Sequence, residues 1–216
     1  NKNSKKSIIK KIDISKYKTI NQEKELDNLI GILEEQSIIS IDTETTSLSP
    51  IDADLVGISV CYSSNKAYYI PLKHKKSKCL NEKLVFKKVK KIFEDPSIKK
   101  IGQNIKFDYI ILKRYGINVG PIEDTMLLSY TLDAGINRHN LDTLSEIHLN
   151  HKTISFKDLV GSGKNQKSFE EIDLKQATEY AAEDADVTFR LFEILKKRLD
   201  EEKLNRIYEF FEKPMV

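Results

Sequence analysis

The sequence has only two cysteines among its 216 residues, Cys61 and Cys79, and it has no CxxC pair. This spacing indicates neither a disulfide framework nor a zinc site, so we expect reduced, structural thiols. His148 and His151 could share a helical face, but they have no Cys or carboxylate partner at the spacing of metal ligands. The composition therefore points away from small secreted domains and zinc proteins.

Long apolar runs and an N-terminal signal are also missing. No stretch of about 18 apolar residues occurs, so no membrane-spanning helix is expected. No secretory signal peptide is visible, and residue 1 is Asn rather than Met. We therefore expect a cytoplasmic protein without membrane contact, and a chain that is a piece of something longer.

Neither sign of charge is in large excess. The chain has 36 Lys and Arg and 33 Asp and Glu, which gives a net charge of +3. The lysines nevertheless gather in two groups, within residues 73–78 and 87–91. Because Lys and Ile are common throughout the chain, we interpret both groups as solvated faces rather than as evidence of nucleic-acid binding.

The hydrophobic pattern predicts one α/β domain behind a polar segment. Residues 1–20 are Lys-rich and aperiodic and look like a linker. A helix and three strand-like runs follow, the latter at 37–44, 55–62 and 67–72, which favours an antiparallel meander. Further helices are expected at 85–93, 104–115, 123–132, 140–149 and 173–200, with a short strand at 100–102. Asn104 is predicted to cap one of these helices, and Asp173 with Gln176 to form a capping box at the start of the last. The order of elements indicates a mixed sheet with helices on its faces.

Four carboxylates and one tyrosine stand at three separate places in this pattern. Asp42 and Glu44 end the first predicted strand, and side chains two apart on a strand point to the same face. Asp108 lies near the first turn of its helix. Tyr180 and Asp184 are four apart in the last long helix and therefore share a face. Each piece alone is typical of a solvated strand end or helix surface.

Together these pieces predict a divalent metal site. The small side chains of Ala181 and Ala185 would let the long helix approach the sheet closely. Hard ions such as Mg²⁺ prefer oxygen ligands, and two ions about 4 Å apart can activate a water and stabilise the departing oxygen of a phosphodiester. A tyrosine with a pKa near 10 is a poor base at neutral pH. We therefore expect Tyr180 to orient the attacking water by a hydrogen bond.

Three motifs carry a resemblance to a known family. DTETTSL (42–48), GQNIKFD (102–108) and YAAEDADVT (180–188) are similar, in order and spacing, to the three exonuclease motifs of bacterial DNA polymerase I. Residues 138–166 also resemble that family, and the similarity covers about residues 38–216. The resemblance implies a ribonuclease H-like fold, with an expected five-stranded mixed sheet, and removal of nucleotides from a DNA 3′ end during proofreading. It divides the chain into an exonuclease domain at 21–212 and the start of a polymerase domain at 213–216.

The resemblance also implies roles for individual residues. Asp42, Glu44, Asp108 and Asp184 match the metal-binding carboxylates of the family, which hold two Mg²⁺ ions, with Mn²⁺ as a substitute. Tyr180 matches its water-orienting tyrosine. All four carboxylates are present, which favours an active enzyme.

Five more residues match positions near the bound strand: Leu48, Gln103, Asn104, Arg138 and Phe156. Leu48 corresponds to an apolar residue that wedges beside the terminal base. Glu179 stands five residues before Asp184, where relatives with a histidine base carry that histidine, so this site is of the tyrosine type. Phe107 is a departure, because relatives often have tyrosine there.

The expected partners are a single-stranded or frayed DNA 3′ end and a polymerase domain in the same parent chain. A monomer associated with the bacterial nucleoid is expected. One alternative is a ribonuclease of the same superfamily, because the four carboxylates do not exclude a 2′-hydroxyl. Another is a catalytically silent domain that braces a polymerase or holds single-stranded DNA.

Overall fold

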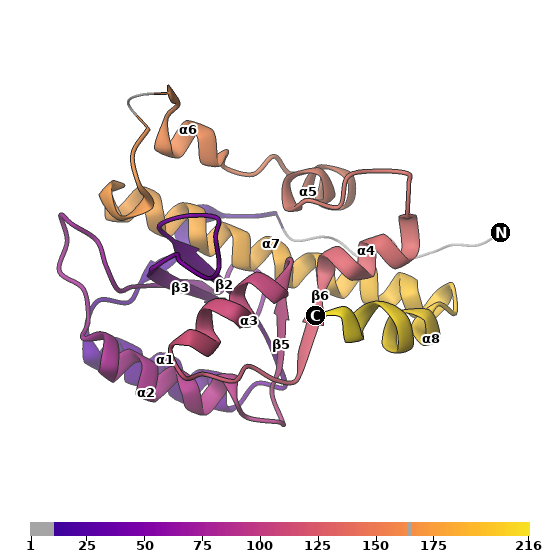
Figure 1. Ribbon diagram of the computed structural model, residues 1–216, viewed down its shortest axis with the longest axis horizontal. Helices are drawn as coiled ribbons and strands as arrows, with labels where there is room; N and C mark the ends of the chain where they lie inside the picture. The colour runs from indigo at the N-terminus through magenta and orange to yellow at the C-terminus, as the bar shows by residue number, and fades with distance from the viewer. Residues whose placement is uncertain (1–10, 164–165) are drawn as a thin grey trace.

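The computed structural model describes residues 11–163 and 166–216, which form a mixed sheet with helices on both faces (Figure 1). The strands are β1 (Lys18–Thr19), β2 (Ile38–Thr45), β3 (Leu55–Cys61), β4 (Ala67–Pro71), β5 (Lys99–Gly102) and β6 (Ile122–Asp124). They lie in the order β1-β4-β3-β2-β5-β6. The pairs β2–β3 and β3–β4 are antiparallel, which confirms the predicted meander. The other three pairs are parallel.

Two layers of helices cover the sheet. One apolar core joins it to α1 (Glu23–Glu34), α2 (Glu82–Phe93) and α3 (Ile105–Arg114). The other joins it to α4 (Thr125–Asp133), α5 (Leu141–Leu149) and the long α7 (Leu174–Glu201). The short α6 (Phe156–Val160) lies beyond α7, and α8 (Asn205–Ile207) begins the C-terminal turns (Figure 1). None of the helices among the described residues is both long and apolar enough to cross a membrane.

The sheet has six strands, so the prediction of five was wrong. The sequence reading missed β1, which falls in the segment expected to be a linker, and β6, which falls at the start of a predicted helix. Strands of two or three residues are too short to show an alternating pattern. Residues 1–10 of the expected linker lie outside the described residues, but Tyr17 and Ile20 are buried in the cores.

Strand β2 separates the two layers through its alternating side chains. Ile39 and Ile41 belong to the core shared with α1, α2 and α3. Ser40 faces the other way and donates a hydrogen bond to the Ala185 carbonyl of α7 at 2.7 Å. By the same alternation, Asp42 and Glu44 point toward α7 while Thr43 points toward α3.

The two predicted caps differ in the structure. Asp173 caps α7 by accepting hydrogen bonds from the N–H groups of Lys175 and Gln176, at 3.0 and 3.3 Å. Asn104 takes the N-cap position of α3 but makes no side-chain cap bond, and its φ of 60° is left-handed. The carboxylate of Asp124 caps α3 in its place, since it accepts from the N–H groups of Asn104 and Ile105. Asn104 is therefore suited to the turn rather than to capping, because asparagine tolerates this conformation well.

Candidate active site

Three acidic side chains from two elements meet at the end of β2. Carboxylate oxygens of Asp42, Glu44 and Asp184 all lie within 4.8 Å of one another. Asp42 and Glu44 come from β2 and Asp184 from α7. Ala181 and Ala185 are fully buried on α7, as expected for a helix that packs closely on a sheet. The predicted meeting of the strand end and the helix face is thus observed.

Asp108 reaches the same strand end from the α3 side. It is buried, and its carboxylate accepts a hydrogen bond from the Thr43 hydroxyl at 2.5 Å. It does not belong to the group of three, but the charge of Asp42 acts on it. The middle residue of Asp42-Thr43-Glu44 therefore ties the fourth carboxylate to the strand. Sequence reasoning missed this role of Thr43, although strand alternation assigns it to the α3 face.

Burial and mutual repulsion both disfavour ionisation of these acids. Burial raises the pKa of Asp42 from 3.8 to about 6. Burial raises the pKa of Glu44 well above its usual range, and the charges of Asp42, Asp184 and Asp108 raise it further. The pKa values of Asp108 and Asp184 are raised in the same way, by burial first and by the charge of Asp42 next. Cations at this point would remove the repulsion that the carboxylates otherwise feel.

The donor set fits hard divalent ions. Every candidate ligand is a carboxylate oxygen, as Mg²⁺ and Mn²⁺ prefer. Oε1 of Glu44 is buried and has no hydrogen-bond partner among the described residues. Buried polar atoms nearly always have a partner, so this oxygen is suited to bind an ion.

Tyr180 stands one helical turn before Asp184, and its hydroxyl is near enough to that carboxylate for each group to shift the pKa of the other. Burial first, and then the neighbouring carboxylates, raise the pKa of Tyr180 far above 10. The phenol therefore keeps its proton at neutral pH. It can orient a water but cannot serve as the base.

The family follows from comparison with known proteins. A family model described as 3′–5′ exonuclease matches residues 17–200. The chain belongs to this family. It is 41% identical to DNA polymerase I of Rhizobium leguminosarum over 94% of this chain, and 42% identical to DNA polymerase I of Borreliella burgdorferi over 92% of it. The chain spans about a fifth of these relatives, since each match covers 22% of the relative.

Among solved structures, this exonuclease resembles NrnC of Brucella melitensis, with a TM-score of 0.66 and 24% identity over 89% of this chain and 85% of that chain. Identity this low supports the fold alone. The ribonuclease H-like fold expected from the sequence is confirmed, with the sixth strand as the correction.

Three of the residues that the exonuclease was predicted to use against a DNA strand are open to solvent. Leu48 is 92% exposed in the loop between β2 and β3. Arg138 is exposed between α4 and α5 and makes no ion pair with a described residue. Phe156 is 43% exposed, with its ring 5.8 Å from that of Tyr180 and 6.5 Å from that of the buried Phe169. Part of the Phe156 side chain therefore packs against other aromatic rings, and part is open to solvent.

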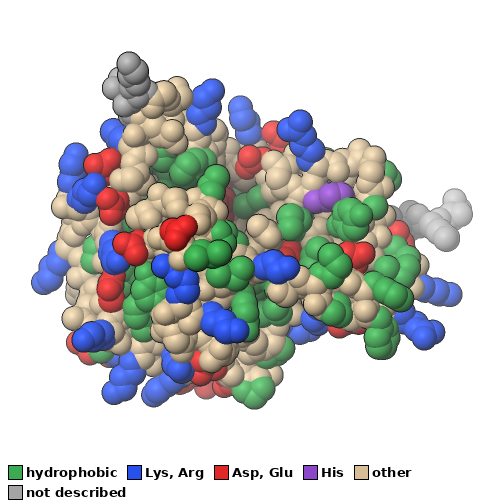
Figure 2. Space-filling view, in the orientation of Figure 1, with side chains coloured by type: hydrophobic (Ala, Val, Ile, Leu, Met, Phe, Trp, Pro, Cys, Tyr) green, Lys and Arg blue, Asp and Glu red, His purple; other side chains and the backbone are tan. Residues whose placement is uncertain are grey.

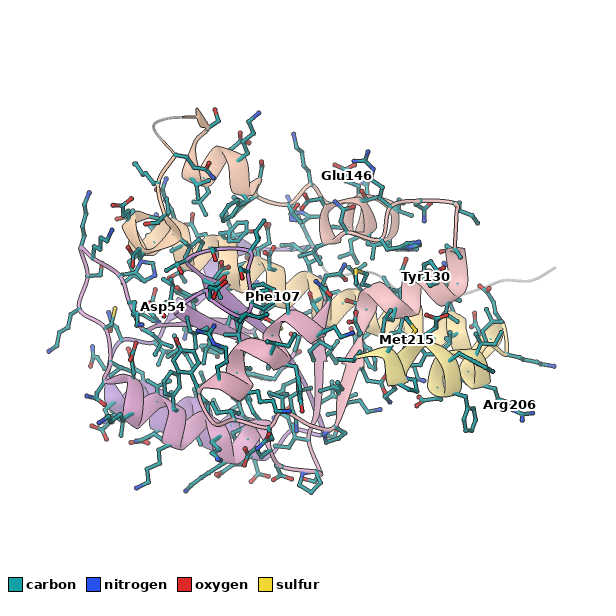
Figure 3. The ribbon with its side chains drawn as sticks, viewed as in Figure 1. Asp54, Phe107, Tyr130, Glu146, Arg206 and Met215 are labelled. Atoms are coloured by element: carbon teal, nitrogen blue, oxygen red, sulfur yellow. The ribbon has the colours of Figure 1, made fainter. Side chains whose placement is uncertain are left out.

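Gln103 has a different setting from the other strand-binding candidates. Its side-chain nitrogen donates to the His139 carbonyl at 2.7 Å, and its oxygen accepts from the Thr125 hydroxyl at 2.5 Å. It thus holds the segment that carries Arg138. Phe107 extends from α3 (Figure 3) and packs, partly buried, against the core that α3 shares with the sheet.

Lysines of both groups pair with acidic side chains. Lys88 pairs with Glu23 and Asp27, and Lys75 pairs with Glu170 and Glu171. Figure 2 shows basic side chains dispersed among acidic ones on the visible face. These pairings favour the interpretation as solvated faces.

Proposed function

We propose that this domain is a two-metal-ion 3′→5′ exonuclease that hydrolyses the last phosphodiester bond of a DNA strand and releases nucleoside monophosphates. The observation that carries this proposal is the convergence of the Asp42, Glu44 and Asp184 oxygens, with Asp108 held to the same strand by Thr43. Asp42, Glu44, Asp108 and Asp184 would hold two Mg²⁺ ions, for which Mn²⁺ can substitute.

When bound, the ions activate a water and stabilise the departing oxygen. The protein residues hold the reactants in place. Tyr180 keeps its proton and donates a hydrogen bond that orients the attacking water. Leu48 wedges beside the terminal base, and the free face of Phe156 stacks on an unpaired base. Arg138 and Asn104 contact the strand, while Gln103 also supports the Arg138 segment.

The resemblance to DNA polymerase I favours DNA as the substrate and proofreading as the role. We propose that the domain acts as a monomeric unit inside a longer polymerase chain in the bacterial cytoplasm, near the nucleoid. Within that chain, we propose that the exonuclease domain begins before the expected residue 21 and ends at residue 212, and that residues 213–216 begin the polymerase part. Residues 13–20 then belong to the fold rather than to a free linker, since β1 pairs with β4.

A single assay tests the proposal against its alternatives. Single strands of DNA and RNA with a 5′ label are incubated with the protein in Mg²⁺, in Mn²⁺ or in chelator. Stepwise shortening of DNA from the 3′ end, dependent on metal and faster than on RNA, is the expected result. Faster digestion of RNA would favour a ribonuclease. Strand binding without digestion in any metal would favour a silent DNA-holding domain.

A further inference from the structure

Glu183 is an acidic residue beside the metal site that points away from it. It precedes Asp184 on α7 and is only 1% exposed. One carboxylate oxygen lies 2.8 Å from Nε2 of His151, and the other accepts the N–H of Ile154 at 2.6 Å. Glu183 therefore binds the segment between α5 and α6 at two points.

The segment that Glu183 binds leads directly to Phe156. Residues 150–155 connect α5 to α6, and Phe156 is the first residue of α6. Figure 1 shows α5 and α6 lying along one side of α7. Further bonds attach the segment to α5, because Ser145 donates its hydroxyl to the His151 carbonyl, the His151 N–H donates to the Ser145 carbonyl, and Thr153 donates to Asp142. Among the described residues, the two Glu183 hydrogen bonds are the ones that join this segment to α7.

We propose that Glu183 is a positioning residue that fixes the 151–154 segment against α7, and thereby places Phe156 beside Tyr180 for binding the strand. The proposal rests on the proposed role of Phe156 in strand binding. The ring of Phe156 touches α7 through Tyr180, but α6 is only five residues long. A short helix at the surface needs a fixed entry point to hold its first side chain in one place.

The acidic identity of Glu183 supports this role. The residue stands in a helix that already places Asp184 and Asp186 nearby, and the charge of Glu183 raises the pKa of Asp184. A buried carboxylate among like charges is unfavourable unless it makes strong hydrogen bonds. The contacts with His151 and Ile154 occupy both carboxylate oxygens of Glu183.

The test uses the 216-residue chain and a short single-stranded oligodeoxynucleotide with a 5′ fluorophore. KM and kcat are measured in Mg²⁺, and the dissociation constant is measured by anisotropy in chelator. Glu183→Gln should raise KM and the dissociation constant about tenfold, because a hydrogen bond to a charged group typically contributes at least that factor. The value of kcat should stay within about threefold, since the metal ligands are untouched.

The matched control is Glu179→Gln, which removes an acidic charge one turn earlier on α7, where Glu179 lies 3.9 Å from Lys175. It should leave KM and kcat unchanged. His151→Ala removes one of the two bonds from the loop side without altering α7, and it should raise KM about threefold, less than Glu183→Gln. This variant keeps the test valid if Glu183→Gln melts at a much lower temperature.

The double variant Glu183→Gln/Phe156→Ala should bind no worse than Phe156→Ala, because both changes act on one contact. If Phe156→Ala raises KM while Glu183→Gln and His151→Ala do not, the positioning role is wrong but the strand-binding role of Phe156 stands. If Glu183→Gln lowers kcat and leaves KM unchanged, the residue acts through the charge of Asp184, which also overturns the proposal. An unchanged KM in Phe156→Ala would instead contradict the proposed function of Phe156 itself.

Discussion

Two aspartates two residues apart on α7, Asp184 and Asp186, have opposite surroundings. Asp186 is fully buried, yet its carboxylate accepts hydrogen bonds from the Tyr17 hydroxyl at 2.8 Å, from the Asn65 N–H at 3.0 Å and from two nitrogens of Arg190. Asp184 instead lies among other acids, and burial together with the charge of Asp42 raises its pKa well above the usual range. Hydrogen-bond donors of the protein thus stabilise the charge of Asp186, whereas the charge of Asp184 lies among like charges.

We infer from this difference that Asp186 serves the stability of the fold and Asp184 serves the active site. Asp186 joins the N-terminal segment, the β3–β4 turn and α7, so its donors serve the fold. The raised pKa values of Asp184 and its neighbours mean that ionisation of these acids costs stability, and the proposed cations would offset this cost. We therefore expect changes at the two aspartates to have opposite effects on stability and activity.

The largest expected effect is on hydrolysis. Asp42→Ala and Asp184→Ala should each slow digestion of a labelled DNA strand by about a thousandfold or more, and the double variant should be little worse, because residues that act as one unit are not additive. Initial rates in Mg²⁺ at saturating DNA measure this. Activity within a few-fold of wild type in either single variant would remove that residue from the metal site.

Asp186→Asn should show the reverse pattern. Removing a buried charge that accepts from Arg190 should destabilise the fold by about 3 kcal/mol, in the range for a broken buried ion pair. The rate at a temperature where the variant is folded should stay near wild type. Urea denaturation gives the free energy of unfolding, and a loss of activity without a loss of stability would contradict the comparison.

A smaller effect is expected for Tyr180→Phe. It removes a hydrogen bond to a charged group, typically worth about 1.5–3 kcal/mol, and should therefore slow the reaction about 10- to 100-fold. The ring stays, so its contacts with Phe156 and Phe169 and the melting temperature should stay as well. An unchanged rate at saturating metal, where chemistry limits, would show that the phenol does not orient the water.

The sequence predicted the parts of this account that depend on regular patterns. Alternation gave the three strands of the meander, and the spacing of Tyr180 and Asp184 placed both on one face of α7. What it could not give were contacts between distant residues, such as Thr43 with Asp108 and Glu183 with His151. Such contacts depend on which segments the folded sheet and helices bring together. A single sequence has no periodic pattern that reports this proximity.

The two weakest strands show the same limit. β1 has two residues and β6 has three, so neither contains an alternation to detect. Each exists because a neighbouring strand, β4 or β5, offers free backbone groups for pairing. The prediction of a linker at residues 13–20 was wrong for this reason. The polar composition of this segment is compatible with an edge strand as well as with a linker.

The raised carboxylate pKa values also make the stability of the fold depend on pH, with a definite sign. A carboxylate whose pKa is raised by folding weakens the fold once the pH rises above the unfolded value, near 4, and the penalty grows until the pH passes the folded pKa. For Asp42 this window runs from about 4 to about 6. The penalty from this group is therefore fully present at about pH 8, and a metal ion that binds only the folded form should offset it.

The most direct test of the central claim is the melting temperature of wild type, Asp184→Asn and Asp186→Asn at about pH 8, in chelator and in Mg²⁺. Asp184→Asn should melt above wild type in chelator and gain less from metal, because one repelling charge and one ligand are gone. Wild type should gain about 2.7 kcal/mol when Mg²⁺ reaches a hundred times its dissociation constant. Asp186→Asn should melt below wild type in both conditions, yet gain as much from metal. Equal melting of wild type and Asp184→Asn in chelator, with no shift in Mg²⁺ for either, would contradict a shared metal site.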